Sequence, residues 1–499
     1  MSTTLANPTE MIRQGAPRLI HSDEELEEYT QALFALTAKP DPTPEEGEAI
    51  ELMTLLVERY EQERYPIPAA EPAYSETTAA LTILLVFLIP LAAAGVALIH
   101  TGLSRSRSAA HTMLASLLIA AVAALVYGAC GFAWQGVTGH PGHSILIAGR
   151  AWRWIGNESF FLHSITVSEP PAAMVACFGV FSAGLCTLIP LGAGADRWRL
   201  GAALASAVFV AGIVFPLFAH WTWAGWLRDL GNLYGLGGGY VDLAGSGAIH
   251  ALGGMSALAL CWTLGPRRSK YTLDGMPVAL PGHNTVLVLA GCLLAWTGWL
   301  GLNGAGALLF GGLSASALPL VAIDTTFAAA AAALTAAAVT RIRFRRPDAS
   351  LCANGWVGGL VASSGACAFF TPFTAVFVGA IAGLLIPLSV EWLDIYLELD
   401  DPGGAISVYG VGGVWGMLAT GLLADIPGIG SGQFLAQLVA VSTLLGFALP
   451  VFYAWHRLLN RVYPQRVSDE GERQGMDLHE LGAGAYPEFV IHREDFSQR

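Results

Sequence analysis

Eleven long apolar segments constrain the fold of this chain more than any other feature. Each is close to the roughly 20 residues that a helix needs to cross the hydrocarbon core of a bilayer. Lipid offers no partners to backbone polar groups, so apolar segments of this length cross as helices, which bond internally. The sequence therefore predicts an all-α polytopic membrane protein with eleven transmembrane helices, at about residues 79–101, 110–136, 170–192, 201–223, 243–264, 281–302, 317–340, 350–371, 374–393, 404–424 and 432–456.

The composition supports this class. Hydrophobic residues make up 54% of the chain and charged residues only 13%, whereas soluble globular domains carry about 25% charged residues. Glycine is frequent, at 58 residues, and small residues let helix backbones approach closely in lipid. The net charge of −13 lies mostly in residues 1–75, which hold fifteen acidic and five basic residues. The sequence shows no basic patch that would indicate a nucleic-acid partner.

The acidic beginning of the chain is expected to fold separately. Ser22 with Glu25, and Thr43 with Glu46, match the capping-box pattern of helix starts. The proline-rich stretch YPIPAAEP then acts as a stiff linker to the first apolar segment. We predict an acidic helical N-terminal extension, a transmembrane domain and a cytoplasmic C-terminal tail, at residues 1–75, 76–456 and 457–499.

Residues that carry chemistry do not form enzyme patterns in this sequence. The seven cysteines lie mostly in apolar segments and form no CxxC pair, which is typical of small core residues. We find no metal cluster, nucleophile triad or phosphate loop. The sequence therefore predicts no enzyme, no cofactor and no metal site. The N-terminus also lacks the pattern of a cleavable signal peptide.

Positive charges between the apolar segments predict the orientation. An odd number of crossings places the two ends of the chain on opposite sides of the membrane. Positively charged loops stay in the cytoplasm, and Arg150, Arg153 and Arg228 alone fall on the other side. We therefore expect a multi-pass protein of the cell membrane with its N-terminus outside and its C-terminus in the cytoplasm. The cytoplasmic set is Arg105, Arg107, Arg197, Arg199, Arg267, Arg268, Lys270, Arg341, Arg343, Arg345 and Arg346.

Two stretches far apart in the chain repeat one pattern. In VDLAGSGAIHALGG, Asp242 precedes His250 by eight residues, and in DDPGGAISVYGVGG, Asp401 precedes Tyr409 by eight residues. Each stretch then ends in two glycines. The fifth and tenth segments carry these stretches, so the chain holds two copies of five segments, inserted with opposite orientation. Inverted repeats meet near the membrane midplane, where substrate paths run along their interface, and paired glycines suit two backbones that touch.

Several motifs together resemble the ammonium transporter family (Amt/Mep/Rh). They are VDLAGSGAIHALGG, LLAWTGWLGLNGAGA, HWTWAGW, GADRWRL and DDPGGAISVYGVGGVWGM, with GMDLHELGAGAY in the tail. The resemblance covers about residues 78–487. It implies a homotrimer with one narrow pore in each subunit. Ammonium would be collected at the outer mouth, lose a proton and cross as ammonia and a proton. The resemblance also implies a PII-type regulatory protein as a partner at the cytoplasmic face.

The same resemblance implies the functional residues. Trp223, Asp242 and Phe178 fall at the outer ammonium site, and Trp299, Leu302 and Asn303 line the pore. His250 resembles the first of two pore histidines. The sequence departs from the family pattern where Tyr409 replaces the second histidine, Leu302 and Ser182 replace two gate phenylalanines, and Gly306 replaces a serine that faces the cation.

The chemistry of His250 and Tyr409 suggests a modified proton path. A charge at the bilayer centre costs about 2.5–3.5 kcal/mol even on lenient scales, so a pore that passes neutral ammonia avoids that cost. A neutral imidazole offers one donor and one acceptor and titrates near pH 6.5, whereas a phenol titrates near 10. We predict that Tyr409 hydrogen-bonds His250 and weakens proton relay. Packing roles for both residues, and helix capping by Asp242, are the alternatives.

Other functions remain open from the sequence. A sensor with the transporter fold and a weakly conducting pore is one alternative, and a channel for another small neutral molecule, such as carbon dioxide or methylamine, is a second. Asp324 is a carboxylate at membrane depth, where ionisable residues are usually functional, but the sequence gives it no role beyond a buried hydrogen bond.

The N-terminal extension has a resemblance of its own. The stretch PTPEEGEAIELMTLLVERYEQERYPIP is similar to the N-terminal segment of HigA-type antitoxins, without the DNA-binding helices that follow there. Those antitoxins are cytoplasmic, whereas the charge pattern predicts that this extension lies outside. An inert acidic appendage is the alternative reading.

Overall fold

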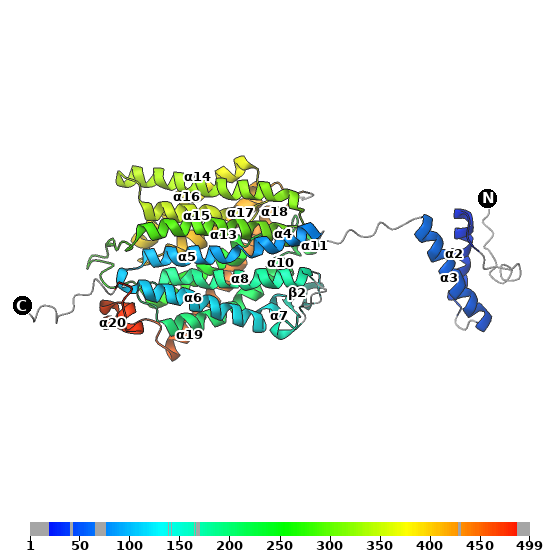
Figure 1. Cartoon of the computed structure of the whole chain (residues 1–499), viewed down its shortest axis with the longest axis horizontal. Coiled ribbons are helices and arrows are strands. Elements are labelled where there is room, and N and C mark those ends of the chain that lie inside the picture. The colour runs from blue at the N-terminus through cyan, green and yellow to red at the C-terminus, as the bar shows by residue number, and fades with distance from the viewer. Residues whose placement is uncertain are drawn as a thin grey trace, which may run out of the picture. The chain divides into compact units, whose positions relative to one another are not determined.

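The chain divides into two units between Ser75 and Glu76. In this computed structural model, the described residues of the smaller unit form two helices, and the long apolar helices found among the described residues belong to the larger unit (Figure 1). The predicted linker YPIPAAEP lies outside the described residues. The structure describes residues 19–39, 43–64, 76–137, 139–140, 142–163, 165, 170–427 and 431–486.

The N-terminal unit pairs helix α2 (Asp23–Thr37) with helix α3 (Pro44–Arg64). Both helices start at predicted capping residues. The Ser22 hydroxyl accepts an N–H of the first turn of α2 at 3.2 Å, and Thr43 and Glu46 cap each other's backbone N–H groups at 3.0 and 3.3 Å. The two helices bury a small core between them, which includes Tyr29, Ala32, Leu36 and Met53.

In its described residues, the first half of the larger unit combines helices with one β-hairpin. The antiparallel strands β1 (Gly142–Ile147) and β2 (Arg150–Gly156) form that hairpin, which the all-α prediction missed. The label η marks short helical turns, which are 3₁₀-helical where they span three residues and π-helical where they span five or six. The helical elements are α4 (Glu76–Val86), α5 (Ile89–Leu103), η1 (Ser106–Ser108), α6 (Ala109–Val126), η2 (Tyr127–Gly131), α7 (Phe132–Gln135), η3 (Phe160–Leu162), α8 (Pro170–Gly194), α9 (Leu200–Phe209), η4 (Val210–Val214), α10 (Phe215–Trp223), α11 (Leu230–Tyr234), η5 (Ser246–Ala251) and α12 (Leu252–Leu264).

The second half follows the same plan and ends in a short tail. Its elements are α13 (Thr285–Gly311), η6 (Ala315–Ala317), α14 (Leu318–Phe344), α15 (Ala349–Ser363), α16 (Pro372–Tyr396), η7 (Ile406–Val411), α17 (Gly412–Leu423), α18 (Gln433–Thr443), η8 (Leu444–Ala448) and α19 (Leu449–Val462), followed by α20 (Asp469–Gln474) and η9 (Asp477–Leu481) in the tail.

The count of membrane-length helices differs from the prediction. Ten helices in the described residues are long and apolar enough to cross a membrane, whereas the sequence predicts eleven. The predicted segment 350–371 is helical only over Ala349–Ser363, which is 15 residues. At 1.5 Å per residue that helix is about 22 Å long, shorter than the roughly 30 Å hydrocarbon core. The apolar residues beyond Ser363 continue as turns within the protein interior.

The two copies of the repeat touch through glycines. A side chain on Gly254 would lie 2.3 Å from the backbone nitrogen of Gly410, and one on Gly413 would lie 2.6 Å from the carbonyl oxygen of Ser246. Both distances are shorter than any real contact of a side-chain carbon, so only glycine allows these backbones to meet. The predicted glycine contact between the two copies is therefore confirmed.

Loops with the predicted cytoplasmic cations meet at one end of the larger unit. Arg267 bonds Asp196 at 2.9 Å and Asp400 at 2.8 Å, which joins the loops after α8, α12 and α16. The tail docks at the same end, where Asp477 accepts two backbone N–H groups at the start of α6 at 3.2 and 2.7 Å. Figure 1 shows α20 at this end, and β2, α10 and α11 at the opposite end.

Candidate functional site

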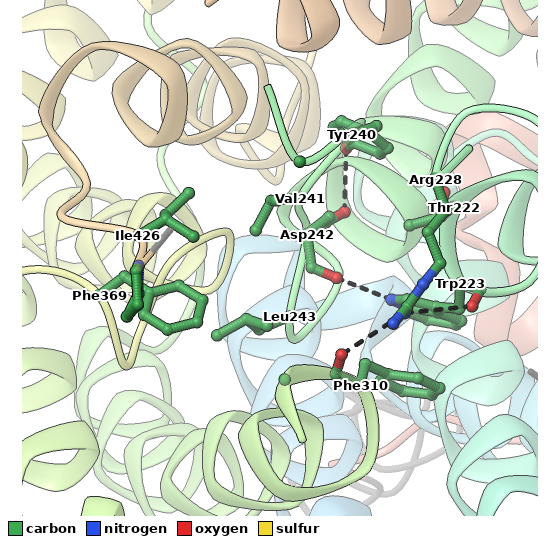
Figure 2. Close-up of a pocket in the computed structure, with 13 residues that line it drawn as sticks. Thr222, Trp223, Arg228, Tyr240, Val241, Asp242, Leu243, Phe310, Phe369 and Ile426 are labelled. Atoms are coloured by element: carbon green, nitrogen blue, oxygen red, sulfur yellow. Dashed lines mark hydrogen bonds between the residues drawn. The ribbon is translucent and has the colours of Figure 1, made fainter. Parts of the chain in front are cut away.

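A cavity of about 220 Å³ opens at the end of the larger unit that carries the β-hairpin. Its lining comes from the C-terminal ends of α10 and α13 and from the segment that leads into η5. Figure 2 shows Trp223, Arg228, Asp242 and Phe310 gathered on one side of it. Two residues predicted for the outer ammonium site, Trp223 and Asp242, therefore line one cavity.

Asp242 caps η5, the π-helical turn that starts the fifth apolar segment, the last of the first repeat copy. Its two carboxylate oxygens accept the four backbone N–H groups of residues 245–248, at 2.7 to 3.0 Å, and the hydroxyl of Tyr240 at 3.1 Å. These groups need partners because the first N–H groups of a helix have none within it. The capping alternative for Asp242 is confirmed. Its contact with Trp223 runs through the backbone, since the Asp242 carbonyl accepts the indole N–H at 2.7 Å.

Three aromatic rings form the wall beside Asp242. Phe310 stacks on Trp223 with ring centroids 4.4 Å apart and an angle of 7° between the planes. Phe178 meets both rings edge to face, at 5.7 and 5.2 Å. The sequence prediction included Phe178 and Trp223 but missed Phe310. One signal was available, because Trp299, Asn303 and Phe310 are spaced to share a face of one helix.

The structure accounts for two departures from the family pattern, the glycine at position 306 and the serine at position 182. A side chain at Gly306 would lie 2.4 Å from the carbonyl oxygen of Leu243, so a serine there would displace the backbone that leads into η5. Ser182 is fully buried, and within the described residues its hydroxyl has no hydrogen-bond partner. The aromatic contact comes instead from Phe178, one helical turn earlier.

His250 lies between the two repeat copies, in η5. It is fully buried and stacks on Trp299 with ring centroids 5.0 Å apart at an angle of 19°. The ring of Tyr409, in η7, lies 6.2 Å away between centroids. Within the described residues, neither ring nitrogen of His250 has a hydrogen-bond partner. The predicted hydrogen bond from Tyr409 to His250 was therefore wrong, although the predicted proximity of the two rings is confirmed.

The remaining predicted pore residues, Leu302 and Asn303, lie on α13 one helical turn after Trp299. Leu302 is fully buried on α13. Asn303 donates to the Thr325 hydroxyl at 2.9 Å and, at 3.5 Å, to the Ser363 hydroxyl, so its amide joins α13 to α14 and α15. Asp324 is buried on α14, and in the described part of the chain neither of its carboxylate oxygens has a hydrogen-bond partner. The buried hydrogen bond expected for Asp324 is therefore not formed.

A second cavity, of about 140 Å³, lies at the opposite end of the larger unit, and Asp400, Asp401 and Ser407 contribute to its lining. Asp401 caps η7, accepting two backbone N–H groups at 2.9 and 2.7 Å. Asp400 accepts two guanidinium bonds from Arg267, at 2.8 and 2.9 Å. Burial opposes ionisation of Asp400, but the guanidiniums of Arg197 and Arg267 outweigh it and hold the pKa of that carboxyl well below its usual value.

Comparison with known proteins decides the family. A model of the Ammonium Transporter Family matches residues 80–486. The chain belongs to this family. The resemblance predicted over about residues 78–487 is confirmed, and with it the prediction of a multi-pass membrane protein that transports ammonium.

Relatives within the ammonium transporter family match over most of their length. Ammonium transporter Amt2 of Archaeoglobus fulgidus is 36% identical over 428 residues, which cover 81% of this chain and 87% of that protein. The ammonium transporter of Bacillus subtilis is 31% identical over 412 residues, which cover 80% of this chain and 96% of that protein. A solved sensor Amt protein is 28% identical with a TM-score of 0.73, covering 81% and 97%. The solved structure of Candida albicans Mep2 shares the fold, with a TM-score of 0.70 and 23% identity. The match covers 85% of this chain and 93% of that one.

Proposed function

We propose that this ammonium transporter moves its substrate between the two cavities, past His250, as ammonia and a proton. One observation supports this most: His250 is buried at the contact of the two repeat copies, and in the described residues both of its ring nitrogens lack partners. A buried polar group without a partner is costly, so a group that serves no ligand would normally be paired. A neutral imidazole can accept one hydrogen bond and donate another to a passing ammonia.

Tyr409 would slow the proton along this route. Its ring lies beside that of His250 but supplies no hydrogen bond to it. Unperturbed phenol and imidazole pKa values differ by about 3.5, which corresponds to roughly 4–5 kcal/mol between the two proton positions. We therefore propose transport that carries little net charge compared with a pore that has two histidines.

A sensor is the second candidate function. Tyr409 at a position of the proton path favours it, because a pore that conducts weakly can still change conformation when it binds substrate. The similarity to a solved sensor Amt protein, at 28% identity, is compatible with this reading. Binding of ammonium without flux through correctly folded protein would favour the sensor over the transporter.

Orientation and partners form a further part of the proposal. We propose that the end with Arg267 and the docked tail faces the cytoplasm, because positively charged loops are retained there. The N-terminus would then lie outside, and a PII-type protein would bind at the cytoplasmic end of a homotrimer. Cysteines placed singly at Ser269 and Ser350 test the orientation. Ready labelling of both from outside intact cells, with an impermeant reagent, would reverse it.

The transport proposal is tested in liposomes with purified protein. Ammonium-evoked current and internal pH change are measured for the parent chain and for His250→Ala. We expect flux to be lost or its selectivity to change, because the imidazole is the hydrogen-bonding group of the path. His456→Ala is the matched control, since His456 is equally buried but bonds Gln465 at 3.1 Å. Parent-like flux and selectivity in folded His250→Ala would leave this histidine a packing residue.

A further inference from the structure

Two helix ends converge on one positively charged side chain at the outer cavity. Helix α10 ends at Trp223 and helix α13 at Gly311. The Arg228 Nη1 group donates to the carbonyl oxygen of Trp223 at 3.3 Å and to that of Phe310 at 3.5 Å. Carbonyls in the last turn of a helix have no partner within it and carry the negative end of the helix dipole. The position of Nη1 is therefore favourable for a cation.

The walls of this position also suit a cation. The stacked rings of Trp223 and Phe310 belong to the same cavity as Arg228, and aromatic faces attract cations. Figure 2 shows the guanidinium lying between the two carbonyl oxygens and beside these rings. An ammonium ion has only N–H donors, as a guanidinium does, so the same carbonyls would serve both.

Neighbouring carboxylates do not neutralise Arg228. In the described residues no carboxylate lies within ion-pair distance of it. Asp229, the next residue, forms two hydrogen bonds with Arg153, at 2.7 and 2.5 Å. Asp242 directs both of its oxygens to the backbone of residues 245–248 and to Tyr240. Within the described residues, the Arg228 guanidinium therefore forms no ion pair, and its hydrogen bonds go to the carbonyl oxygens of Trp223 and Phe310.

We propose that Arg228 is a tethered cation that occupies the outer cation site and competes with ammonium for it. The inference rests on the proposed transport function and adds a residue that determines the apparent affinity. Substrate enters the site when the guanidinium withdraws, so Arg228 raises the ammonium concentration needed for half-maximal flux. A change of about tenfold corresponds to about 1.4 kcal/mol of competition, and that is the size of effect we expect.

The test compares ammonium uptake in liposomes for the parent, Arg228→Ala and Arg228→Lys. We expect the half-saturating ammonium concentration to fall about tenfold in Arg228→Ala and to stay near the parent value in Arg228→Lys, which keeps the charge. Free guanidinium chloride at millimolar concentration should inhibit Arg228→Ala competitively and the parent only weakly. Arg150→Ala is the matched control, because Arg150 carries the same charge over the ring of Tyr234 and does not line the cavity.

The outcomes separate this inference from the transport proposal. Equal half-saturation in the parent and Arg228→Ala, without competition by guanidinium, would overturn the inference while leaving transport intact. If none of the proteins transports ammonium, tryptophan fluorescence is titrated with guanidinium chloride. Binding to Arg228→Ala alone would then support the cation site although the transport proposal had failed, and equal binding to the parent would overturn the site. Arg228→Gln replaces Arg228→Ala if the latter does not fold.

Discussion

The proposed outer and inner ends of the substrate path share one backbone arrangement and differ in chemistry. At each end an aspartate caps a π-helical turn of six residues, and an aromatic residue within that turn faces the other copy. The outer aspartate, Asp242, holds four N–H groups beside an aromatic cavity, whereas the inner one, Asp401, holds two beside the Arg267–Asp400 pair.

This difference shows which parts of the repeat the fold requires. The cap, the turn and the glycine contact are present in both copies, because each copy must satisfy its helix start and approach its partner. The imidazole and the phenol differ between the copies, and the proposed function places them on the substrate path. Symmetry in the scaffold therefore does not imply equal roles for the two ends, and the following experiments test this comparison.

Removal of the two caps should give the largest effect. Asp242→Ala leaves four buried N–H groups without an acceptor, at about 1–3 kcal/mol each, so we expect a loss of about 4 kcal/mol or more, which would prevent folding. Asp401→Ala frees two N–H groups and should cost about half as much. Thermal unfolding in detergent measures both. Equal losses would mean that the two ends depend on their caps to the same extent.

Breaking the two charged pairs, Arg267–Asp400 and Arg153–Asp229, should lower stability by different amounts. Arg267→Ala leaves Asp400 buried without its main partner, which should cost about 3–5 kcal/mol. Arg153→Ala breaks the Arg153–Asp229 pair at the outer end, where about a third of the arginine side chain is exposed, and should cost at most about 1 kcal/mol because solvent screens it. Unfolding midpoints in detergent compare them. A larger loss in Arg153→Ala would contradict the description of the inner pair as the tighter one.

Added methyl groups at the glycine contact should have an intermediate effect. Gly254→Ala and Gly413→Ala each force apart two backbones that now touch, and overpacking of this kind costs about 1–3 kcal/mol. Gly184→Ala is the matched control, because a methyl group there meets no atom within 4 Å. Thermal unfolding and ammonium flux are measured together. Unchanged stability in both contact variants would show that the two copies can separate without penalty.

Exchange of the aromatic side chain should give the smallest change in free energy. Tyr409→His places two groups of similar basicity side by side, and we expect the ammonium-driven current to rise about tenfold, which corresponds to about 1.4 kcal/mol off the barrier. Tyr409→Phe removes the phenol that the proposed proton path uses, so its current should fall below that of the parent. The currents are compared at equal protein density in liposomes. No gain in Tyr409→His would remove the phenol from the proton path.

Local patterns in the sequence were sufficient for much of the fold. Apolar segments, the capping pairs at Ser22 and Thr43, and the glycines at 254 and 413 each depend on neighbours in the chain or on a repeat that can be read directly. The helix expected over 350–371 ends earlier, at Ser363, because a protein interior is as apolar as lipid, so the composition does not change where α15 ends. The strands 142–147 and 150–156 were missed because they lie in a loop between apolar segments.

The site was predictable only in part for a similar reason. Asp242, His250 and Trp223 occur in motifs, so their places follow from the resemblance. Phe310 and Arg228 come together only because the ends of α10 and α13 lie close to each other. That approach depends on the whole fold and cannot be read from neighbouring residues in the chain. The hydrogen bond expected between Tyr409 and His250 failed because a shared register sets neighbouring positions but not the direction of each ring.

The π-helical turns at Ser246–Ala251 and Ile406–Val411 set the rotation of the helices that follow them, and with it the direction in which Gly254 and Gly413 face. A π-helical turn is equivalent to one residue inserted into an α-helix. Deletion of one residue from either turn would restore α-helical geometry and rotate the helix that follows by about 100°, which would carry Gly254 or Gly413 away from the opposite backbone. An insertion or deletion at either turn would therefore break the close approach of the two copies, so the length of each turn is fixed by the contact that the helix after it must make.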